Sequence, residues 1–303
     1  MNKHYRSFND YIKERFGRKL YKLSLSVSNT CPNRDGTVGV GGCIFCSGMG
    51  SGDFAQSASL DVKTQISLAK EKVKDKCKNG SYIAYFQSFT STYCDHDKLK
   101  NALYCALEDE SIYALSIATR PDTLPNDVLS LLNDAAKIKP LFVELGLQSS
   151  KEESIKYIRR GYDNGVYAKA AEELHKIGAE VVTHMIIGLP GEDLCDMLAT
   201  AKFISDCKSD GIKLQLLHVL RGTDLAKDFE KGLFQTLTKK EYIDIIGTVI
   251  EHLPPDMVIH RITGDGPKKI LISPLWSADK KDVMNSVSKE FDRRNVVQGK
   301  FYK

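Results

Sequence analysis

Long hydrophobic runs are missing from this chain. No stretch approaches the roughly 18 uninterrupted apolar residues of a membrane-spanning helix, and residues 1–16 carry charges where a secretory signal has its apolar region. Proline and glycine, 9 and 22 of 303 residues, are too sparse and too scattered for a collagen-like or disordered chain. We therefore expect a folded, cytoplasmic protein with no membrane contact.

Cysteine is also scarce. The chain has eight cysteines, which are too few for a disulfide scaffold in a chain of this length. Five cysteines lie apart from one another and are interpreted as buried structural residues: Cys77, Cys94, Cys105, Cys195 and Cys207. The other three, Cys31, Cys43 and Cys46, are grouped in one Gly-rich segment. Such a group indicates a metal centre.

Two kinds of metal centre fit these three cysteines. Three thiolates can hold a 4Fe-4S cluster and leave one iron open to a substrate or cofactor. A structural zinc site needs four protein ligands, so zinc requires one more from Asp35, His96 or a distant cysteine. The spacing alone favours neither centre.

Short β-rich segments alternate with helical patterns from residue 80 onward, which is typical of βα units around a parallel sheet. The predicted strands are residues 23–27, 82–86, 113–118, 141–145, 181–187 and 213–218, and the predicted helices are residues 62–76, 98–108, 128–136, 167–176 and 193–207. Six units predict an open, three-quarter parallel βα barrel, with an open doubly wound sheet as the alternative. Both folds place ligands at the C-terminal ends of the strands.

Three regions follow from this pattern: an arm over residues 1–22, the partial barrel over residues 23–222, and a C-terminal α+β extension over residues 223–303 that packs on the barrel. The extension is expected to hold helices at residues 240–252 and 282–293, a strand at 257–262 and a loop at 264–267. In the arm, seven basic and two acidic residues are interleaved with five aromatic residues. This arm either grips RNA or docks on the core as an amphipathic segment.

Further motifs run through almost the whole chain: YFQSFTSTY, TRPD, VELGLQS, RRGYD, HMIIGLPGE, LHVLRGT and HRITGD. Together with the cysteine segment NTCPNRDGTVGVGGCIFC, they resemble the radical S-adenosylmethionine (SAM) superfamily. Eleven residues separate Cys31 from Cys43, whereas three are commonest in that superfamily. The longer spacer resembles the branch that contains the Elongator catalytic subunit and, more closely, the YhcC- and YtqA-type (MnmL-like) proteins.

The resemblance implies an enzyme in which Cys31, Cys43 and Cys46 hold a 4Fe-4S cluster. The cluster binds S-adenosylmethionine and cleaves it to a 5'-deoxyadenosyl radical. Cofactor contacts are expected from residues beside the cluster and at strand ends: Phe45, Gln87, Glu144, Gln148, Arg160 and Gly188. Among these, Phe45 and Gly188 are expected at the adenine, and Gln148 and Arg160 at the ribose and the carboxylate, with Arg159 as the alternative to Arg160.

The substrate is less constrained by the sequence. Polar residues on predicted strands are candidates either for a substrate cavity or for hydrogen-bonded core positions: His184, His218, His260 and Arg261. The resemblance implies a role at the wobble uridine of tRNA, where a 5-carboxymethylaminomethyl group becomes 5-aminomethyl, with tRNA as partner and flavodoxin or ferredoxin as electron donor. Two alternatives stay open: radical SAM chemistry on a small molecule or protein, and a noncatalytic zinc or iron-sulfur protein.

Overall fold

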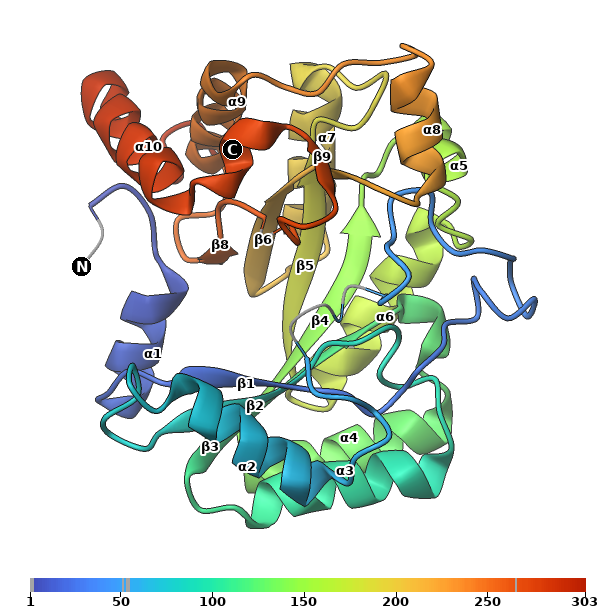
Figure 1. The fold of residues 1–303 in the computed structure, drawn as a ribbon. Helices are drawn as coiled ribbons and strands as arrows, with labels where there is room; N and C mark the ends of the chain where they lie inside the picture. The colour runs from blue at the N-terminus through green and yellow to red at the C-terminus, as the bar shows by residue number, and fades with distance from the viewer. Residues whose placement is uncertain (1–2, 51, 53–54, 265) are drawn as a thin grey trace.

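Seven parallel strands form the main sheet of the computed structural model, which describes residues 3–50, 52, 55–264 and 266–303. The strands of this sheet lie side by side in the order in which they occur in the chain: β1 (Tyr21–Leu25), β2 (Tyr82–Phe86), β3 (Ile112–Thr119), β4 (Leu141–Gln148), β5 (Glu180–Ile187), β6 (Gly211–Leu216) and β8 (Val258–Arg261). The sheet curls into an open barrel with most of its helices outside (Figure 1). This architecture confirms the predicted open parallel barrel.

The predicted count of six units is wrong. The strand expected in the C-terminal extension is β8, which pairs in parallel with β6 and becomes the seventh strand of the barrel. An uncovered β6 edge would leave a row of backbone donors and acceptors without partners, and β8 satisfies them. Asp265, which falls in the loop predicted after this strand, lies outside the described residues.

Most of the helices follow strands and contribute to the core on the outer face of the sheet: α2 (Val62–Val73), α3 (His96–Glu108), α4 (Asn126–Ile138), α6 (Asn164–Lys176), α7 (Leu194–Asp206), α9 (Lys239–His252) and α10 (Lys280–Arg294). Two shorter helices, α5 (Glu152–Tyr157) and α8 (Asp224–Glu230), belong to a smaller apolar cluster that includes Ile44 of the cysteine loop. Polar caps fix several starts, including the capping boxes formed at Asp193 and Thr238. A short antiparallel pair, β7 (Val219–Leu220) and β9 (Leu271–Ser273), and two 3-10 turns, η1 (Pro121–Thr123) and η2 (Leu275–Ala278), complete the described fold. Within the described residues, no helix has the length and apolar character needed to cross a membrane.

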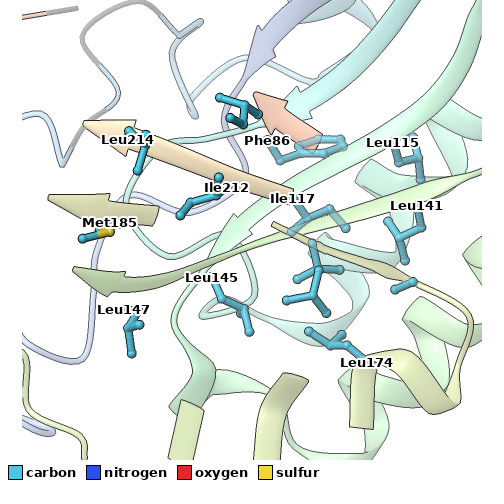
Figure 2. Close-up of a cluster of buried hydrophobic side chains, with 14 of the residues drawn as sticks. Phe86, Leu115, Ile117, Leu141, Leu145, Leu147, Leu174, Met185, Ile212 and Leu214 are labelled. Carbon is cyan, nitrogen blue, oxygen red and sulfur yellow. The ribbon is translucent and has the colours of Figure 1, made fainter. Parts of the chain in front are cut away.

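Side chains of β4 alternate between the two faces of the sheet, and this alternation separates the core from the barrel interior. Residues 141, 143, 145 and 147 are leucine or valine and belong to the main hydrophobic core beneath the helices (Figure 2). The intervening residues, Phe142, Glu144, Gly146 and Gln148, take the inner positions. One strand thus supplies both the packing that holds the sheet and the side chains that line its interior.

The N-terminal helix α1 (Phe8–Phe16) closes the end of the barrel where the strands begin. Ser7 caps it by accepting from Asp10 N, and Gly17 ends it in the left-handed conformation, with φ of +67°. Its apolar face packs against inward-facing strand residues in a second cluster: Ile12, Phe8, Tyr11 and Phe16 against Ile83, Ala114, Phe142 and Val182. The arm therefore docks on the core, which is one of its two predicted roles, at the opposite end of the barrel from residues 31–46.

Residues far apart in the chain meet beside α1 and form a clasp. His4 Nδ1 lies 2.9 Å from Val296 O, and Arg6 N donates to Gln298 Oε1 at 2.8 Å. Ile259 N, on β8, donates to Arg6 O at 2.9 Å. The arm and the extension, predicted as separate regions, thus contact each other as well as the barrel.

Truncating Phe142 tests the role of the cluster under α1. We expect Phe142→Ala to lower the free energy of unfolding by about 3–5 kcal/mol, because it leaves a cavity between the sheet and α1. The control is Leu233→Ala at a side chain that is 68% exposed, where a change of at most about 0.5 kcal/mol is expected. Denaturant unfolding measures both values, and equal losses would contradict the packing described here.

Candidate active site

A cavity of about 300 Å³ lies inside the barrel at the C-terminal ends of the strands. Parallel barrels place their functional groups at this end, because loops of independent sequence converge there. The lining includes residues of the cysteine loop, of several strand ends and of the barrel interior: Cys31, Cys43, Phe45, Cys46, Gln87, Arg120, Glu144, Gln148, Arg160, His184, Lys213, His218 and Arg261. The three grouped cysteines and the barrel interior therefore border one space.

Tight turns fold the loop after β1 back on itself. Arg34 N donates to Cys31 O at 2.8 Å, and Cys46 N donates to Cys43 O at 3.0 Å. Between these turns Gly42 has a φ of +88°, and a Cβ there would lie 3.0 Å from the Arg34 side chain. Glycine thus permits the return that brings all three cysteines to the cavity.

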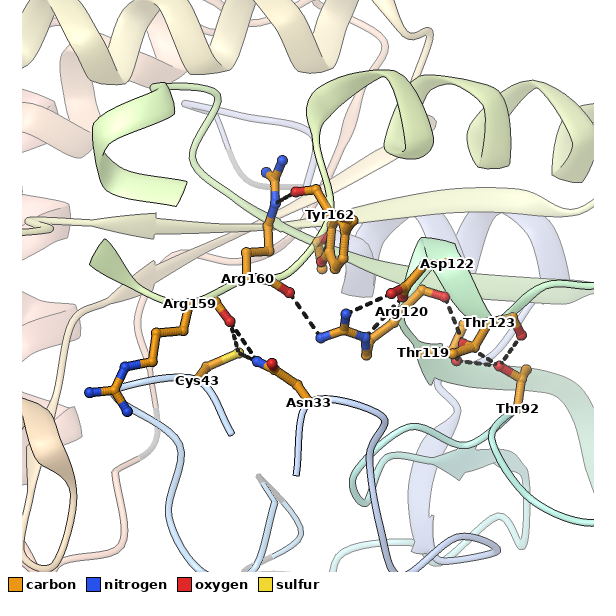
Figure 3. A network of polar contacts seen from close by, with 11 residues as sticks. Asn33, Cys43, Thr92, Thr119, Arg120, Asp122, Thr123, Arg159, Arg160 and Tyr162 are labelled. Carbon is orange, nitrogen blue, oxygen red and sulfur yellow. Dashed lines mark hydrogen bonds and ion pairs between the residues drawn. The ribbon is translucent and has the colours of Figure 1, made fainter. Parts of the chain in front are cut away.

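The Cys43 thiol is held by polar groups of the protein (Figure 3). Asn33 Nδ2 lies 3.4 Å from the Cys43 sulfur and donates to Arg159 O at 2.5 Å. Desolvation, together with the neighbouring charge of Cys46, raises the pKa of Cys43 to about 11. A positively charged metal centre would relieve that repulsion and favour the thiolate.

This donor set fits an iron-sulfur cluster. Within the described residues, no three His, Cys, Asp or Glu side chains converge on a single metal ion. A 4Fe-4S cluster binds each thiolate through a different iron, so its ligands stand around a volume and not at one point. Cys31, Cys43 and Cys46 border one cavity, where they would hold such a cluster, and the cavity continues from them into the barrel.

Five of the six residues expected to contact the cofactor line the cavity: Phe45, Gln87, Glu144, Gln148 and Arg160. Phe45 packs against the apolar cluster of β5 and α8, and Gln87 directly follows β2. Gln148 ends β4 with φ of +69°, a conformation that non-glycine residues rarely adopt. A Cβ on the preceding inner residue, Gly146, would lie 2.9 Å from Gln148 Nε2, so glycine makes room for this amide. Their contacts with the cofactor stay predictions.

Arg160 is buried, and most of its donors serve the protein. Its guanidinium donates to Leu147 O and to Ser149 O, both at 2.8 Å. Its Nε donates to Tyr162 O at 2.9 Å (Figure 3). These bonds fix the backbone on both sides of Gln148. The contact from Arg160 to the cofactor carboxylate stays a prediction, and its observed role is to hold the end of β4.

Gly188 and Arg159 are not among the described residues that line the cavity. Gly188 follows β5 with φ of +88°, and a Cβ there would lie 2.8 Å from Leu237 Cδ1, so the turn and its packing already need glycine. The Arg159 side chain pairs with Asp224 at 2.6 Å, beside α8. The expected approach of adenine to Gly188 and the alternative role of Arg159 stay predictions.

A buried carboxylate occupies the centre of the barrel. Glu144 is 1% exposed and interacts with side chains of five other strands: Lys22 on β1 at 2.7 Å, Tyr85 on β2 at 2.9 Å, Ser116 on β3 at 2.8 Å, His184 on β5 at 2.9 Å and Lys213 on β6. We call Glu144 and these five residues the ionic layer. Its contacts occupy both oxygens of Glu144, which is one of the six residues expected to contact the cofactor, and that cofactor contact stays a prediction.

The protonation states of the side chains in the ionic layer depend on their burial and on the charged groups beside them. Burial favours a neutral acid, yet the ammonium groups of Lys213 and Lys22 hold the pKa of Glu144 well below its usual range. Burial and the charge of Lys213 lower the pKa of His184 to about 4, so its ring is neutral at pH 7. Burial also lowers the pKa of Lys213 to about 7, because the opposing effect of Glu144 is offset by Lys22 and Arg261.

The polar strand residues singled out in the sequence take two different places. Three of them line the cavity: His184, His218 and Arg261. His260 instead stacks on Phe8 of α1, with ring centroids 4.1 Å apart. Lys213 was missed, although its sequence carried a signal. It is the charged residue in a strand whose alternate residues, Ile212 and Leu214, are apolar and belong to the core.

Comparison with known proteins now decides the family. The model described as the radical SAM superfamily matches residues 25–204, and the radical SAM C-terminal domain matches residues 209–293. These spans contain the three cysteines and the described strands of the main sheet from β2 to β8. The chain belongs to the radical SAM superfamily. It is therefore an enzyme of a superfamily that uses a 4Fe-4S cluster and S-adenosylmethionine, as the resemblance implied.

Individual relatives cover most of this radical SAM chain. YtqA of Bacillus subtilis is 42% identical over 99% of this chain and 93% of its own length. YhcC of Escherichia coli K12 is 34% identical over 89% of this chain and 86% of its own length. A tRNA uridine(34) acetyltransferase of Methanocaldococcus jannaschii is 29% identical over 52% of this chain and 29% of its own. The solved structure of an archaeal Elp3 from Methanocaldococcus infernus has the same fold, with a TM-score of 0.69 at 20% identity over 92% of this chain and 65% of that one.

Removing one cysteine of the group tests the cluster site. After anaerobic reconstitution and reduction, we expect the wild-type protein to give an electron paramagnetic resonance signal that changes when S-adenosylmethionine is added. Cys46→Ala should lose or alter this signal, because three thiolates are needed to hold the cluster. Cys195→Ala, at an exposed cysteine on α7, is the control and should behave as wild type. A Cys46→Ala spectrum identical to wild type would contradict the assignment.

Proposed function

We propose that this enzyme acts on the wobble uridine of tRNA and converts its 5-carboxymethylaminomethyl group to 5-aminomethyl. The observation that carries the proposal is the single cavity that joins three thiols to the ionic layer. A side chain that bears an amine and a carboxylate needs polar partners when it leaves water, and the ionic layer supplies them. The similarity to a relative named for tRNA uridine(34) supports this substrate class.

The position of each residue in the cavity determines its proposed role. Cys31, Cys43 and Cys46 hold the cluster, and Gln87 and Gln148 contact S-adenosylmethionine. When bound, the cluster and S-adenosylmethionine would supply the radical that takes a hydrogen atom from the methylene of the carboxymethyl group, with flavodoxin or ferredoxin as the proposed electron donor. Transfer of one further electron from the substrate to the oxidised cluster would leave a C=N bond, and its hydrolysis by water after release would free the 5-aminomethyl group and give the two carbons as glyoxylate. The uridine has to leave its stack to enter the barrel, and the barrel wall then shields the reacting carbon from water.

Positive charge beside the cavity suits an RNA backbone. Arg221 directly follows Leu220, and Lys268 and Lys269 directly follow Pro267. Leu220 and Pro267 both line the cavity, and the three basic residues are exposed. We define Arg221, Lys268 and Lys269 as the basic rim. The basic rim, and not the arm around α1, is where we place the phosphate contacts, because α1 lies at the closed end of the barrel.

Nucleoside analysis of bulk tRNA tests the substrate. A deletion strain should accumulate 5-carboxymethylaminomethyluridine and its thiolated form, because the step that removes the carboxymethyl group is missing. The wild-type gene should restore the normal profile, and the Cys46→Ala gene should not. Mass spectrometry of digested tRNA measures both forms. An unchanged profile in the deletion strain would instead support a small-molecule or protein substrate.

Charge reversal tests the basic rim. The double variant Lys268→Glu/Lys269→Glu should bind tRNA more weakly than the wild type. The slope of the logarithm of its affinity against the logarithm of the salt concentration should become shallower by about one for each lost phosphate contact. The matched control is Lys13→Glu/Lys19→Glu, which reverses two exposed lysines of the arm. This control should bind as wild type does. A larger loss in the control than in the rim variant would return the RNA contact to the arm.

A further inference from the structure

The ionic layer carries more positive than negative charge. Lys22 Nζ lies 2.7 Å from one oxygen of Glu144, and Lys213 contacts the other. The remaining members, Tyr85, Ser116 and the neutral ring of His184, add no charge at pH 7. Two amines thus share one carboxylate. An incoming anion would compensate the excess, and this gain is large inside a barrel of low dielectric constant.

Lys213 is the amine of this pair that faces the cavity. Its side chain is 6% exposed, yet it borders the same space as the three cysteines, whereas Lys22 is not among the described residues that line it. Glu144 is the one acidic side chain in the described lining. An anion that enters past the cysteine loop therefore reaches a floor where Lys213, itself paired with Glu144, borders the cavity, and where the one carboxylate is already paired with two amines.

We propose that Lys213 binds the carboxylate of the substrate's carboxymethylamino group, with Glu144 as the positioning residue that holds the ammonium in place. This inference rests on the proposed function and adds the group that recognises the substrate. In the substrate the carboxylate is joined directly to the methylene carbon that is to be removed. Holding the carboxylate on the floor thus places that methylene above Lys213, on the side of the cavity that leads to the three thiols.

A purely structural role for Lys213 makes a different prediction. A buried ion pair that only supports the fold affects stability when one partner is removed. It has no reason to distinguish a charged substrate from a neutral one. Selectivity for the carboxylate is therefore the quantity that separates binding from structural support.

Two anticodon stem-loops provide the probe. One carries 5-carboxymethylaminomethyluridine at the wobble position, and the other carries the primary amide of the same group, which has nearly the same shape and no negative charge. Their affinities are measured by fluorescence anisotropy with the reconstituted enzyme and S-adenosylhomocysteine, so that no radical forms. We expect the wild type to prefer the carboxylate by about tenfold or more, as a charge-assisted hydrogen bond provides.

Variants at two lysines test the assignment. Lys213→Met should reduce the preference to about twofold or less, because it weakens binding of the carboxylate loop more than binding of the amide loop, and Lys213→Arg should restore part of the preference. Lys268→Met, on the basic rim, is the control. It should weaken both loops equally and preserve their ratio. A full preference in Lys213→Met overturns the inference and leaves the proposed function intact, whereas a wild type that neither binds nor converts either loop removes the proposed function itself.

The wild type alone provides a second readout if Lys213→Met does not fold. The preference for the carboxylate should decline as the pH rises from about 6 to about 9, because Lys213 loses its proton in this range. The groups that face Lys213 come from each neighbouring strand: Lys22, Tyr85, Glu144, His184, His260 and Arg261. Of these, the two histidines titrate below the window because burial lowers the pKa of each. A preference that stays constant over this range would overturn the inference.

Discussion

The carboxylate of Glu144 is the interaction on which the barrel interior depends. Its partners come from five other strands, so one side chain fixes the relative positions of nearly the whole curved sheet. Removing one member of such a buried group leaves the others charged and without compensation, which typically costs about 3–5 kcal/mol. The same contacts set the depth at which the cavity ends, and thus how far a substrate can enter.

The inner face of the barrel is built in three levels. The apolar cluster sealed by α1 lies lowest, the ionic layer lies above it, and the cavity with its cysteines lies at the top. On β4 these levels are represented by Phe142, Glu144 and Gln148, because inward positions recur every second residue. Water and ligands therefore reach the ionic layer from the cysteine side, since α1 and its aromatic residues fill the other end.

The parts of this arrangement that depend on local pattern could be predicted from the sequence. The spacing of Cys31, Cys43 and Cys46, the alternation of strands and helices, and the inward polar residues of β4 are all visible in one stretch of chain. The seventh strand escaped the count because β7, α8 and α9 separate it from β6 and break the βα period. Lys22 was missed because its partner, Glu144, is brought to it only when the sheet curls. Lys213 stands between core residues of its strand, which is a visible signal, but that signal does not reveal the partner. The expectation that Arg160 contacts the cofactor came from the family resemblance and stays a prediction, whereas its bonds to the carbonyls of Leu147, Ser149 and Tyr162 could not be foreseen, because no sequence pattern displays a backbone acceptor.

The clasp between residues 4–6 and residues 296–298 has a consequence for how the protein is made. Its partners are separated by as many as 292 positions, and contacts of such separation carry a high entropic cost of loop closure and form late. In a nascent chain the cysteine loop and the first strands leave the ribosome long before residue 298 does. The end of the barrel that holds the cysteines can take shape while the other end is still unsealed. The contacts that seal the barrel floor therefore form only after nearly the whole chain has been made.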